Sequence, residues 1–585
     1  MKRKIFGLIL IYFFIFVLIY GIFILNPFYT DWIVAKMQPT MIKILSCYAS
    51  YPEMLRDVPL NHLDFLGFLN SNVGLVYSDI NAYPFKASIL FVDYIPFLSI
   101  FAKILKIYCI KSSEFVDFQF MGIVGAVNFI LMGLFSFLII RKITKCGYLN
   151  GLLGSLFFVI SPVLLERFPV HFALSSQWLV LAAFLPFLYY REFCEKKIYF
   201  ILYWAILGFL DAGIQVYFFP TTVFIVVAFM FYDYYLSNDK KFRGRYLSAL
   251  CFGAILFYIL AGGLGTNISA ETDLQWFSLY SFNLNSFFNP TNSENFFYST
   301  LLPFLNGKFP VRDACNWEGF SYLGAGILVP LTFIIGYLLI NLPKKTFREK
   351  YSEFLTKYKV AIAVASVFFV VTMLYSCSYE ICFNDRLLID IQLPEWIQRI
   401  LSVFRAPARV IWADFYLVYF FVICFVIKNF KPVFVSLLLG VLLVTQAVDL
   451  SVFFRVYNGL YAHKTVYKSP LKNEKWDNLK EGKKYLFIHD LERLETYHYR
   501  DVFYWALKNN FKINSLLSSR IPKYEQRVIN IRMKKPTDED LFVFLPAQKE
   551  LVEKSNLSNC YLLDGFIVCV KSNISELQKY KIDVK

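Results

Sequence analysis

Residues 5–25 read IFGLILIYFFIFVLIYGIFIL, a run of 21 residues without a charge that follows the basic start MKRK. About 20 apolar residues are enough for a helix to cross a bilayer. The run is too long for the apolar region of a signal peptide, which has roughly 7–15 residues, and it lacks a small-residue cleavage site. The sequence therefore predicts a retained membrane anchor with a cytoplasmic amino end, because basic residues flank spans on that side.

The whole chain has the composition of an integral membrane protein. Of its 585 residues, 57% are apolar and 17% are charged, and the mean hydropathy is +0.51. Soluble domains carry about 25% charged residues. The net charge of +16 lies mostly in short gaps between apolar runs, which is the distribution of the positive-inside rule. We therefore expect membrane lipids as partners and no nucleic acid.

Eleven membrane-spanning helices are predicted within an all-α polytopic domain over residues 1–450. Basic residues cluster in alternate gaps between these helices, and residues 26–116 form a long first loop on the outer side. An odd number of crossings places the carboxyl end outside as well. The predicted spans are 5–25, 118–140, 148–165, 176–190, 198–216, 217–235, 246–266, 322–342, 359–377, 410–428 and 432–449.

One more apolar stretch, residues 89–105 (ILFVDYIPFLSIFAKIL), lies inside the first loop. Asp93, Pro96 and Lys103 interrupt it. If it crossed the membrane, every later basic cluster would move to the outer side. We therefore expect a re-entrant or interfacial helix here.

Residues 451–585 are predicted to form a small extracytoplasmic α/β domain. The charge becomes mixed, and KKYLFIHD and DLFVFLP have the pattern of strands, with a helix between them that runs through residues 504–508. The last element, CYLLDGFIVC, has Asp564 and Gly565 between two apolar runs, the preferred two-residue hairpin turn.

This turn places Cys560 directly opposite Cys569, with Cα atoms about 4.5 Å apart, inside the disulfide range. In an oxidising compartment we expect the two cysteines to be bonded; the alternative is a reduced pair within the hairpin. Cys377 and Cys382 form a weaker candidate pair. The eleven cysteines contain no C-x-x-C pair, and the five histidines have no i, i+3 or i, i+4 spacing, so no zinc or iron site is predicted.

Three acidic residues of the first loop are candidate catalytic groups. Asp31 ends the stretch NPFYTDW at the outer mouth of the first span, and Asp79 and Asp93 follow it. Asp93 lies within the interfacial segment, where a buried acid needs a partner. On position alone, a solvated loop carboxylate is an equally good interpretation of Asp31.

Arg405 and Arg409 lie just outside the tenth span, in the stretch FRAPAR. If the segment is helical after Pro407, two arginines four residues apart face the same way and can grip one phosphate through their planar guanidinium groups. The alternative is a pair of interfacial arginines that extend toward water.

A third polar group surrounds the long loop at residues 267–321. Glu318 precedes glycine and aromatic residues that can contact a sugar, although a close helix approach is the preferred interpretation of Gly324 and Gly326. His171 and Gln177 stand at another outer turn, and Asp211 lies inside a span. For these single polar residues we first expect hydrogen bonds between helices.

Five stretches together resemble a group of bacterial polytopic membrane proteins of undefined function, which are similar to the GT-C class of glycosyltransferases. They are SILFVDYIPFLSIFAKIL, HFALSSQWLVLAAF, EGFSYLGAG, FRAPARVIW and YWALKNNFKINSLLSSR. Gln177 stands where the resemblance leads us to expect a second histidine, and Asp93-Tyr94 replaces an acid-hydroxyl pair.

The resemblance implies a multi-pass protein of the bacterial cytoplasmic (inner) membrane with a GT-C-like fold and a polyprenyl-phosphate-linked sugar as donor. It implies a catalytic acid in the first outer loop, the position of Asp31. In an inverting transfer, one carboxylate deprotonates the acceptor hydroxyl, and the leaving lipid phosphate needs cations. Arg405 and Arg409 supply these cations. Asp79 or Asp93 is the alternative base, or a ligand of a divalent metal.

The expected function is transfer of a sugar to a cell-surface acceptor on the outer face. A carrier or flippase for a lipid-linked glycan is the alternative, and it predicts charged residues along a path through mid-membrane. A third possibility is a membrane anchor that presents the tail for assembly. This one predicts that only loss of residues 451–585 abolishes function.

Overall fold

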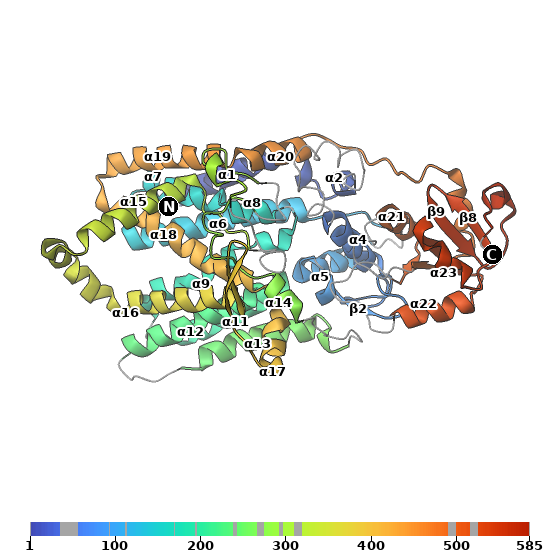
Figure 1. Cartoon of the computed structure of the whole chain (residues 1–585), viewed down its shortest axis with the longest axis horizontal. Helices are drawn as coiled ribbons and strands as arrows, with labels where there is room; N and C mark the ends of the chain where they lie inside the picture. The colour runs from blue at the N-terminus through green and yellow to red at the C-terminus, as the bar shows by residue number, and fades with distance from the viewer. Residues whose placement is uncertain are drawn as a thin grey trace.

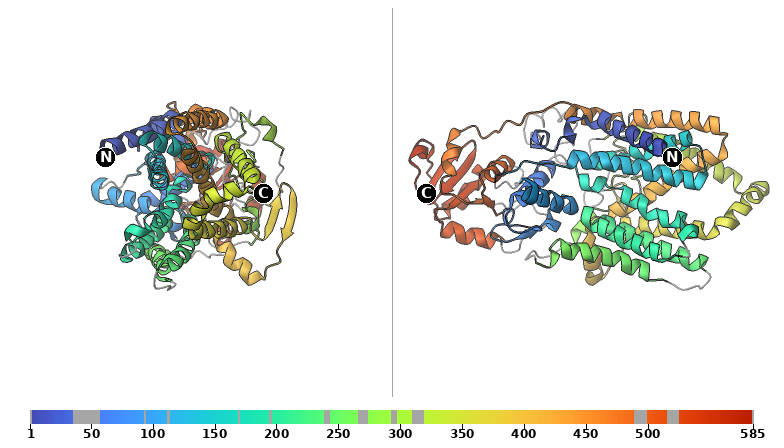
Figure 2. Two further views of the ribbon diagram at one scale, coloured as in Figure 1. Left: turned by 90° about the vertical axis from the view of Figure 1, so that its left-hand side faces the viewer. Right: turned by 180° about the vertical axis from the view of Figure 1, so that it is seen from behind.

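The computed structural model describes residues 2–34, 57–92, 94–110, 114–168, 170–193, 196–237, 243–265, 274–291, 297–308, 319–488, 499–514 and 525–583. The molecule is elongated (Figure 1), with a body of long helices at one end and an α/β domain at the other. A block of short elements from the first loop lies between them, as the view from behind also shows (Figure 2).

Within the described ranges, six helices are long and apolar enough to cross a membrane. They are α1 (Lys2–Tyr20), α6 (Met121–Thr144), α12 (Phe218–Leu236), α16 (Lys345–Ser376), α18 (Trp412–Asn429) and α19 (Pro432–Asp449). Shorter apolar helices occupy the other predicted spans: α7 (Tyr148–Val159), α9 (Trp178–Leu188), α11 (Ile198–Ile214), α13 (Arg245–Leu260) and α15 (Ala325–Asn341). The chain is therefore a mostly helical membrane protein, and eleven crossings remain a prediction.

Two pairs of glycines allow helices of this body to pack closely. A Cβ on Gly208 of α11 would collide with the Leu250 carbonyl oxygen of α13, and a Cβ on Gly253 would collide with the Ala205 carbonyl oxygen. Gly324 and Gly326 are confirmed as a close approach, because a side chain on either would run into α19 at Gln446. Small residues are the usual means of bringing membrane helices together.

The connection between α15 and α16 lies at the end of the helical body opposite the α/β domain (Figure 1). It holds Lys344 and the first residue of α16, Lys345. The first-loop elements lie at the other end. They are α2 (Asp31–Val34), α4 (Asp57–Asn70), β1 (Tyr77–Ser78), β2 (Ala87–Ser88), η4 (Ile89–Phe91), α5 (Pro96–Leu105) and η5 (Lys106–Ile110).

The apolar stretch 89–105 is not one continuous helix. It begins with the turn η4 and ends with α5, which has 10 residues. Helix α5 continues directly into the five residues of η5, and at no more than 1.5 Å per residue the two together are about 22 Å long or less, which is shorter than the roughly 30 Å of the hydrocarbon layer. Helix α5 packs against α4 and α11. This length agrees with a segment that does not cross the membrane by itself.

The helical body extends past the predicted boundary at residue 451. Helix α20 (Ser451–Tyr461) runs alongside α1, and the rings of Tyr457 and Tyr461 lie 5.3 and 6.1 Å from the ring of Tyr20. An extended connection then leads to the α/β domain (Figure 1).

The α/β domain is built on one five-stranded sheet. Its elements are η11 (Glu474–Leu479), β5 (Tyr485–Ile488), α21 (Arg500–Lys508), β6 (Lys512–Ile513), α22 (Glu525–Lys534), β7 (Asp540–Phe544), α23 (Lys549–Glu553), β8 (Asn559–Leu563), β9 (Phe566–Val570) and η14 (Ser575–Tyr580). The strand order is β6-β5-β7-β9-β8, with β5 parallel to β6 and β7, and β9 antiparallel to β7 and β8. The predicted strands at 485–488 and 540–544 and the helix between them are confirmed.

Alternation along the strands gives the sheet two apolar faces. Leu486 and Val543 belong to the same core as the helical body, whereas Phe487 and Phe542 pack with Ile529 of α22 in a second core. One face of the sheet is thus covered by the rest of the molecule, with α21 against α4.

The β6 edge of the sheet is covered by the first loop. The Ile513 amide donates to the Ile80 carbonyl oxygen (2.7 Å), and the Tyr83 amide donates to the Ile513 carbonyl oxygen (3.0 Å). The Tyr83 ring stacks on Tyr485 with centroids 4.3 Å apart. The first loop and the α/β domain therefore form one body.

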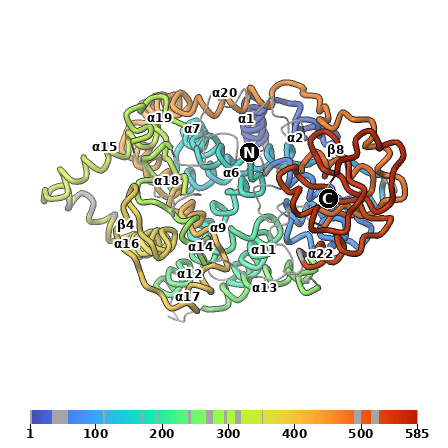
Figure 3. The backbone as a smooth tube through the Cα atoms, turned by 45° about the vertical axis from the view of Figure 1, so that its right-hand side comes forward, coloured from blue at the N-terminus to red at the C-terminus, as the bar shows by residue number. Residues whose placement is uncertain are grey.

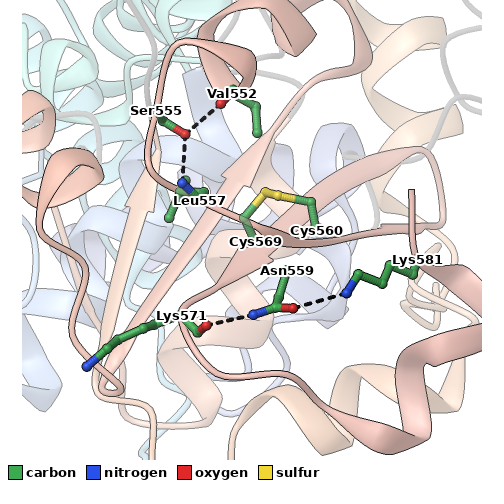
Figure 4. The surroundings of a disulfide bond; sticks show 8 residues. All are labelled: Val552, Ser555, Leu557, Asn559, Cys560, Cys569, Lys571 and Lys581. Atoms are coloured by element: carbon green, nitrogen blue, oxygen red, sulfur yellow. Dashed lines mark hydrogen bonds between the residues drawn. A yellow bond between two sulfur atoms is a disulfide. The ribbon is translucent and has the colours of Figure 1, made fainter. Parts of the chain in front are cut away.

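At the opposite edge of the sheet, β8 and β9 form the hairpin expected from Asp564 and Gly565. Cys560 faces Cys569 in the register, and a disulfide joins them (Figure 4). Cys377 and Cys382, the weaker candidate pair, are both buried and are not joined by a disulfide.

Candidate functional site

Asp31 is positioned by the end of α1 and by the chain that follows α20. Directly after α1, Gly21 adopts a left-handed backbone (φ 75°) against the Ala462 backbone, where a Cβ would collide. The Tyr29 hydroxyl donates to the Thr465 carbonyl oxygen (2.7 Å). Asp31 then opens α2 and is half-buried. The mouth of the first span is therefore held by the connection to the α/β domain.

A buried polar cluster that the sequence did not predict lies nearby, at the junction between the first loop and the α/β domain. The Tyr504 hydroxyl of α21 donates to Asp117 Oδ2 (2.7 Å), and His62 Nε2 of α4 lies 3.8 Å from Asp117 Oδ1. His62 is fully buried. Burial and the charge of Asp117 raise the pKa of Tyr504, and the charge of Asp31 makes a smaller contribution in the same direction. Asp31 therefore borders this cluster.

The cluster keeps Asp117 ionised. Burial alone raises the pKa of Asp117, but the neighbouring His62, with smaller contributions from Tyr504 and Thr30, outweighs burial and lowers the pKa below its ordinary value. Because Tyr504 stays protonated, it donates to this carboxylate throughout the neutral range. Tyr504 and Asp117 are 387 residues apart in the sequence, and His62 lies still further from Tyr504, so sequence spacing gave no signal.

Asp79, the second candidate acid, is used for a contact between domains. Its carboxylate accepts from Lys512 Nζ (2.6 Å) of β6 and from the Ser71 hydroxyl (2.8 Å). Burial raises the pKa of Asp79, and these two partners reverse the shift, so the net change is downward. A carboxyl whose pKa is lowered by an ion pair is a weaker base, and this partner favours a structural role.

Two further candidates, Asp93 and Glu318, lie outside the described residues. Among the residues that are described, no three His, Cys, Asp or Glu side chains gather as a group able to hold a metal ion. Of the acids suggested as metal ligands, Asp79 is already paired with Lys512.

Arg405 and Arg409 are separated by a break in the helix. Arg405 directly follows the turn η9 (Ser402–Phe404), and Ala406 has a non-helical backbone (φ −117°, ψ 75°). The next element, η10 (Pro407–Ile411), is a 3-10 turn instead of the α-helix that the predicted phosphate grip requires. Arg409 is mostly buried over the ring of Tyr217 (4.1 Å), whereas Arg405 lies about equally far from the rings of Trp276 and Tyr280, at 6.0 and 5.9 Å. The two guanidinium groups thus lie over different rings.

Gln177 is held inside the helical body. It is fully buried, accepts a hydrogen bond from the Tyr416 hydroxyl of α18 and donates to the Val163 carbonyl oxygen (3.4 Å). These contacts between helices agree with the structural interpretation of Gln177. His171 precedes the turn η6 (Phe172–Ser175), and its side chain is half-buried.

A second buried charged pair was also missed from the sequence. Glu166 and Arg167 end α8 (Pro162–Arg167), and their side chains meet at 2.8 Å in the interior. The Arg167 guanidinium lies 5.7 Å from the ring of Trp412. The sequence signal that could have predicted this pair is two adjacent, opposite charges at the end of a predicted span. Charge inside a membrane protein is costly unless it is paired.

We expect Tyr504→Phe to loosen the α/β domain from the first loop while the ring at position 504 keeps its contact with Tyr467, at 5.3 Å between ring centroids. A hydrogen bond to a charged group contributes about 1.5–3 kcal/mol. Amide hydrogen exchange in residues 499–514 should become faster in this variant and stay unchanged in Tyr108→Phe, which alters an exposed tyrosine. Equal protection in both variants would contradict a stabilising role for the cluster.

The same contact should depend on pH in the acid range. A carboxyl whose pKa is lowered by folding stabilises the protein above its ordinary pKa, here 3.8, and the stabilisation is lost as the pH falls through the lowered value. Protection of residues 499–514 should therefore decline below about pH 4 in the wild type, and Asp117→Asn should reduce this decline.

Comparison with known proteins places these observations in context. No curated protein gives a significant match to the chain. Its structure is similar to that of an Archaeoglobus fulgidus oligosaccharyltransferase solved in complex with Zn and sulfate, at 12% identity and a TM-score of 0.37, over 96% of this chain and 73% of that one. For the apo form of the same protein the values are 11%, 0.40, 98% and 75%. Residues 9–451 match the profile of one family, so the chain belongs to the family described as a domain of unknown function, DUF6311.

Proposed function

We propose that this protein is a membrane glycosyltransferase of the GT-C type that moves a sugar from a polyprenyl-phosphate donor to a cell-surface acceptor. The observation that carries the proposal is the position of Asp31. This half-buried carboxylate opens α2, which lies beside the end of α1 on the side of the α/β domain (Figure 3). A donor anchored in the bilayer by its lipid presents its sugar at this level.

In the proposed reaction, Asp31 accepts the proton of the acceptor hydroxyl while the hydroxyl oxygen attacks the anomeric carbon. The bond between that carbon and the phosphate oxygen breaks, and the lipid phosphate leaves with the electron pair. The configuration at the anomeric carbon is inverted. Asp79 is a less suitable base because it is paired with Lys512.

The negative charge that develops on the leaving phosphate needs a cation. We assign Arg405 to this role first, because its side chain is more exposed than that of Arg409. Arg409 lies one 3-10 turn away and supports the same region through its stacking on Tyr217. The two arginines therefore have different roles in the proposal, instead of holding the phosphate together as they would on a continuous helix.

The proposed orientation puts the first loop and the α/β domain outside the bacterial cytoplasmic membrane. The basic connection between α15 and α16 lies at the other end of the helical body, as expected for a cytoplasmic connection (Figure 1). The disulfide also fits an oxidising compartment.

The disulfide provides a direct test of this orientation. In cells lysed without reductant, Cys560 and Cys569 should resist alkylation by a maleimide until a reductant is added. Cys560→Ser should lower the stability of the α/β domain by about 2–3 kcal/mol, since the bond closes a short loop. Immediate alkylation of both cysteines in the unreduced wild type would place the domain in the cytoplasm.

The proposed reaction is tested with the purified full-length chain in vesicles that contain a polyprenyl-phosphate with a radiolabelled hexose. With an extract of envelope glycans, lipids and proteins as acceptor, we expect label to leave the lipid fraction and become covalently bound to an acceptor. Movement of the intact donor between leaflets without a new glycosidic bond would instead identify a flippase and reject the proposal.

A further inference from the structure

The segment between α16 and α18 exposes an unusual number of large apolar side chains although it is not a predicted span. The segment comprises β3 (Glu380–Phe383), β4 (Arg386–Asp390), α17 (Glu395–Leu401) and η9. Its exposed members include Leu388, Ile389, Ile391, Trp396, Ile400 and Val403. A surface of this kind marks an interaction site, because proteins rarely leave large apolar patches in water.

The strands β3 and β4 form a two-stranded hairpin, in which β3 is partly buried and β4 is exposed. Ile381 and Cys382 of β3 face the body of the protein, whereas all five residues of β4 are exposed. A two-stranded hairpin is marginally stable in water. The free backbone edge of β4 also excludes a position deep in hydrocarbon, where unpaired amide and carbonyl groups are not tolerated.

Helix α17 separates apolar from charged side chains. Trp396 and Ile400 are four residues apart, so they share one face of the helix. Glu395 and Arg399 form an ion pair (2.6 Å), and both side chains are largely exposed. An apolar face with tryptophan, next to charged residues, is typical of a helix that lies at the surface of a bilayer.

The exposed surface continues that of a membrane-spanning helix. Most of the apolar stretch of α16 is exposed, including Val367, Val370 and Leu374, and α16 leads directly into the hairpin. Figure 2 shows the hairpin and α17 projecting from the flank of the helical body in the end-on view. Phe404, which follows α17, packs on Tyr217 and Phe219 at the outer end of α12.

We propose that residues 380–403 lie in the boundary between headgroups and acyl chains of the bilayer, with phospholipid as their partner. Three observations select lipid as the occupant: continuity with the exposed face of α16, the tryptophan on α17, and a backbone edge that requires nearby water. The segment then anchors the chain just before Arg405 and Arg409. The inference goes beyond the proposed reaction and does not depend on it.

The test uses a photoreactive side chain at two matched isoleucines in the full chain. Ile400 on α17 and Ile531 on α22 of the α/β domain are similarly exposed, at 62% and 54%. Each is replaced separately by benzoylphenylalanine, and the protein is reconstituted in vesicles of phosphatidylcholine and phosphatidylglycerol that contain an alkyne-tagged phosphatidylcholine. After illumination, we expect at least about fivefold more lipid adduct at position 400 than at position 531.

Equal lipid labelling at the two positions would overturn the proposal, as would adducts at position 400 with a second copy of the chain or with the chain itself. If the Ile400 variant fails to fold, quenching of tryptophan fluorescence by brominated phosphatidylcholine gives the same decision. Trp396→Phe should then lose a quenchable component that Trp476→Phe, altered at a buried residue, retains. Identical quenching in both variants would reject a lipid contact.

Discussion

Asp31→Asn should reduce sugar transfer by about 10²- to 10⁴-fold while the protein stays folded, because a positioned general base contributes a factor of this size. Asparagine has nearly the same shape as aspartate but cannot accept the proton of the acceptor hydroxyl. Since Asp31 is only half-buried, loss of its charge leaves no unpaired group in the core. The rate is measured in the vesicle assay with the labelled polyprenyl-phosphate hexose.

Asp477→Asn is the matched control for this substitution. Asp477 is an exposed carboxylate of the α/β domain that pairs with Lys480 (2.9 Å), so the same chemical change there should leave the rate within twofold of the wild type, roughly the range of a surface substitution. If Asp31→Asn transfers sugar at the wild-type rate, Asp31 is not the base. A loss of activity in both variants would point to a general effect of charge.

Gly253→Ala should destabilise the helical body strongly although it adds one methyl group. The new Cβ would collide with the Ala205 carbonyl oxygen of α11, and backbone cannot move aside as a flexible side chain does. Overpacking of a tight contact costs about 1–3 kcal/mol, and α11 and α13 meet along most of their length. We expect a lower aggregation temperature in detergent and a smaller yield of monodisperse protein.

Gly440→Ala provides the comparison for this helix contact. Gly440 lies within α19, and no atom stands within 4 Å of the position that a Cβ would take. Alanine is preferred to glycine inside a helix by roughly 0.5–1 kcal/mol, so this variant should be as stable as the wild type or more so. Similar aggregation temperatures for the two variants would show that α11 and α13 can separate without loss of stability.

The helices of this protein could be predicted from its sequence because the length of an apolar run depends only on neighbouring residues. Each predicted span contains a helix, and the strand at 485–488 and the disulfide hairpin follow from local alternation and one turn. In the stretch 89–105, η4 ends at Phe91 and α5 begins at Pro96, one of the residues that interrupted the apolar pattern.

The contacts of the candidate residues could not be predicted from the sequence in the same way. Asp79 meets Lys512 across 433 residues, and the cluster around Asp117 joins helix α4 and a loop near the amino end to helix α21 of the α/β domain. No local spacing encodes such contacts. The arrangement of Arg405 and Arg409 was missed for a different reason, because the non-helical backbone at Ala406 and the 3-10 turn after it replace the regular helix on which their spacing argument rested.

The pairing of α4 with α21 and of residues 80–83 with β6 has a consequence for biosynthesis. The first loop is among the earliest parts to leave the ribosome, yet the elements that cover it are among the last. At about 5–20 residues per second, the roughly 430 residues between them take on the order of 20 to 90 seconds to synthesise. Throughout that interval the nascent chain holds an uncovered apolar surface, which needs shielding by the bilayer surface or by a chaperone.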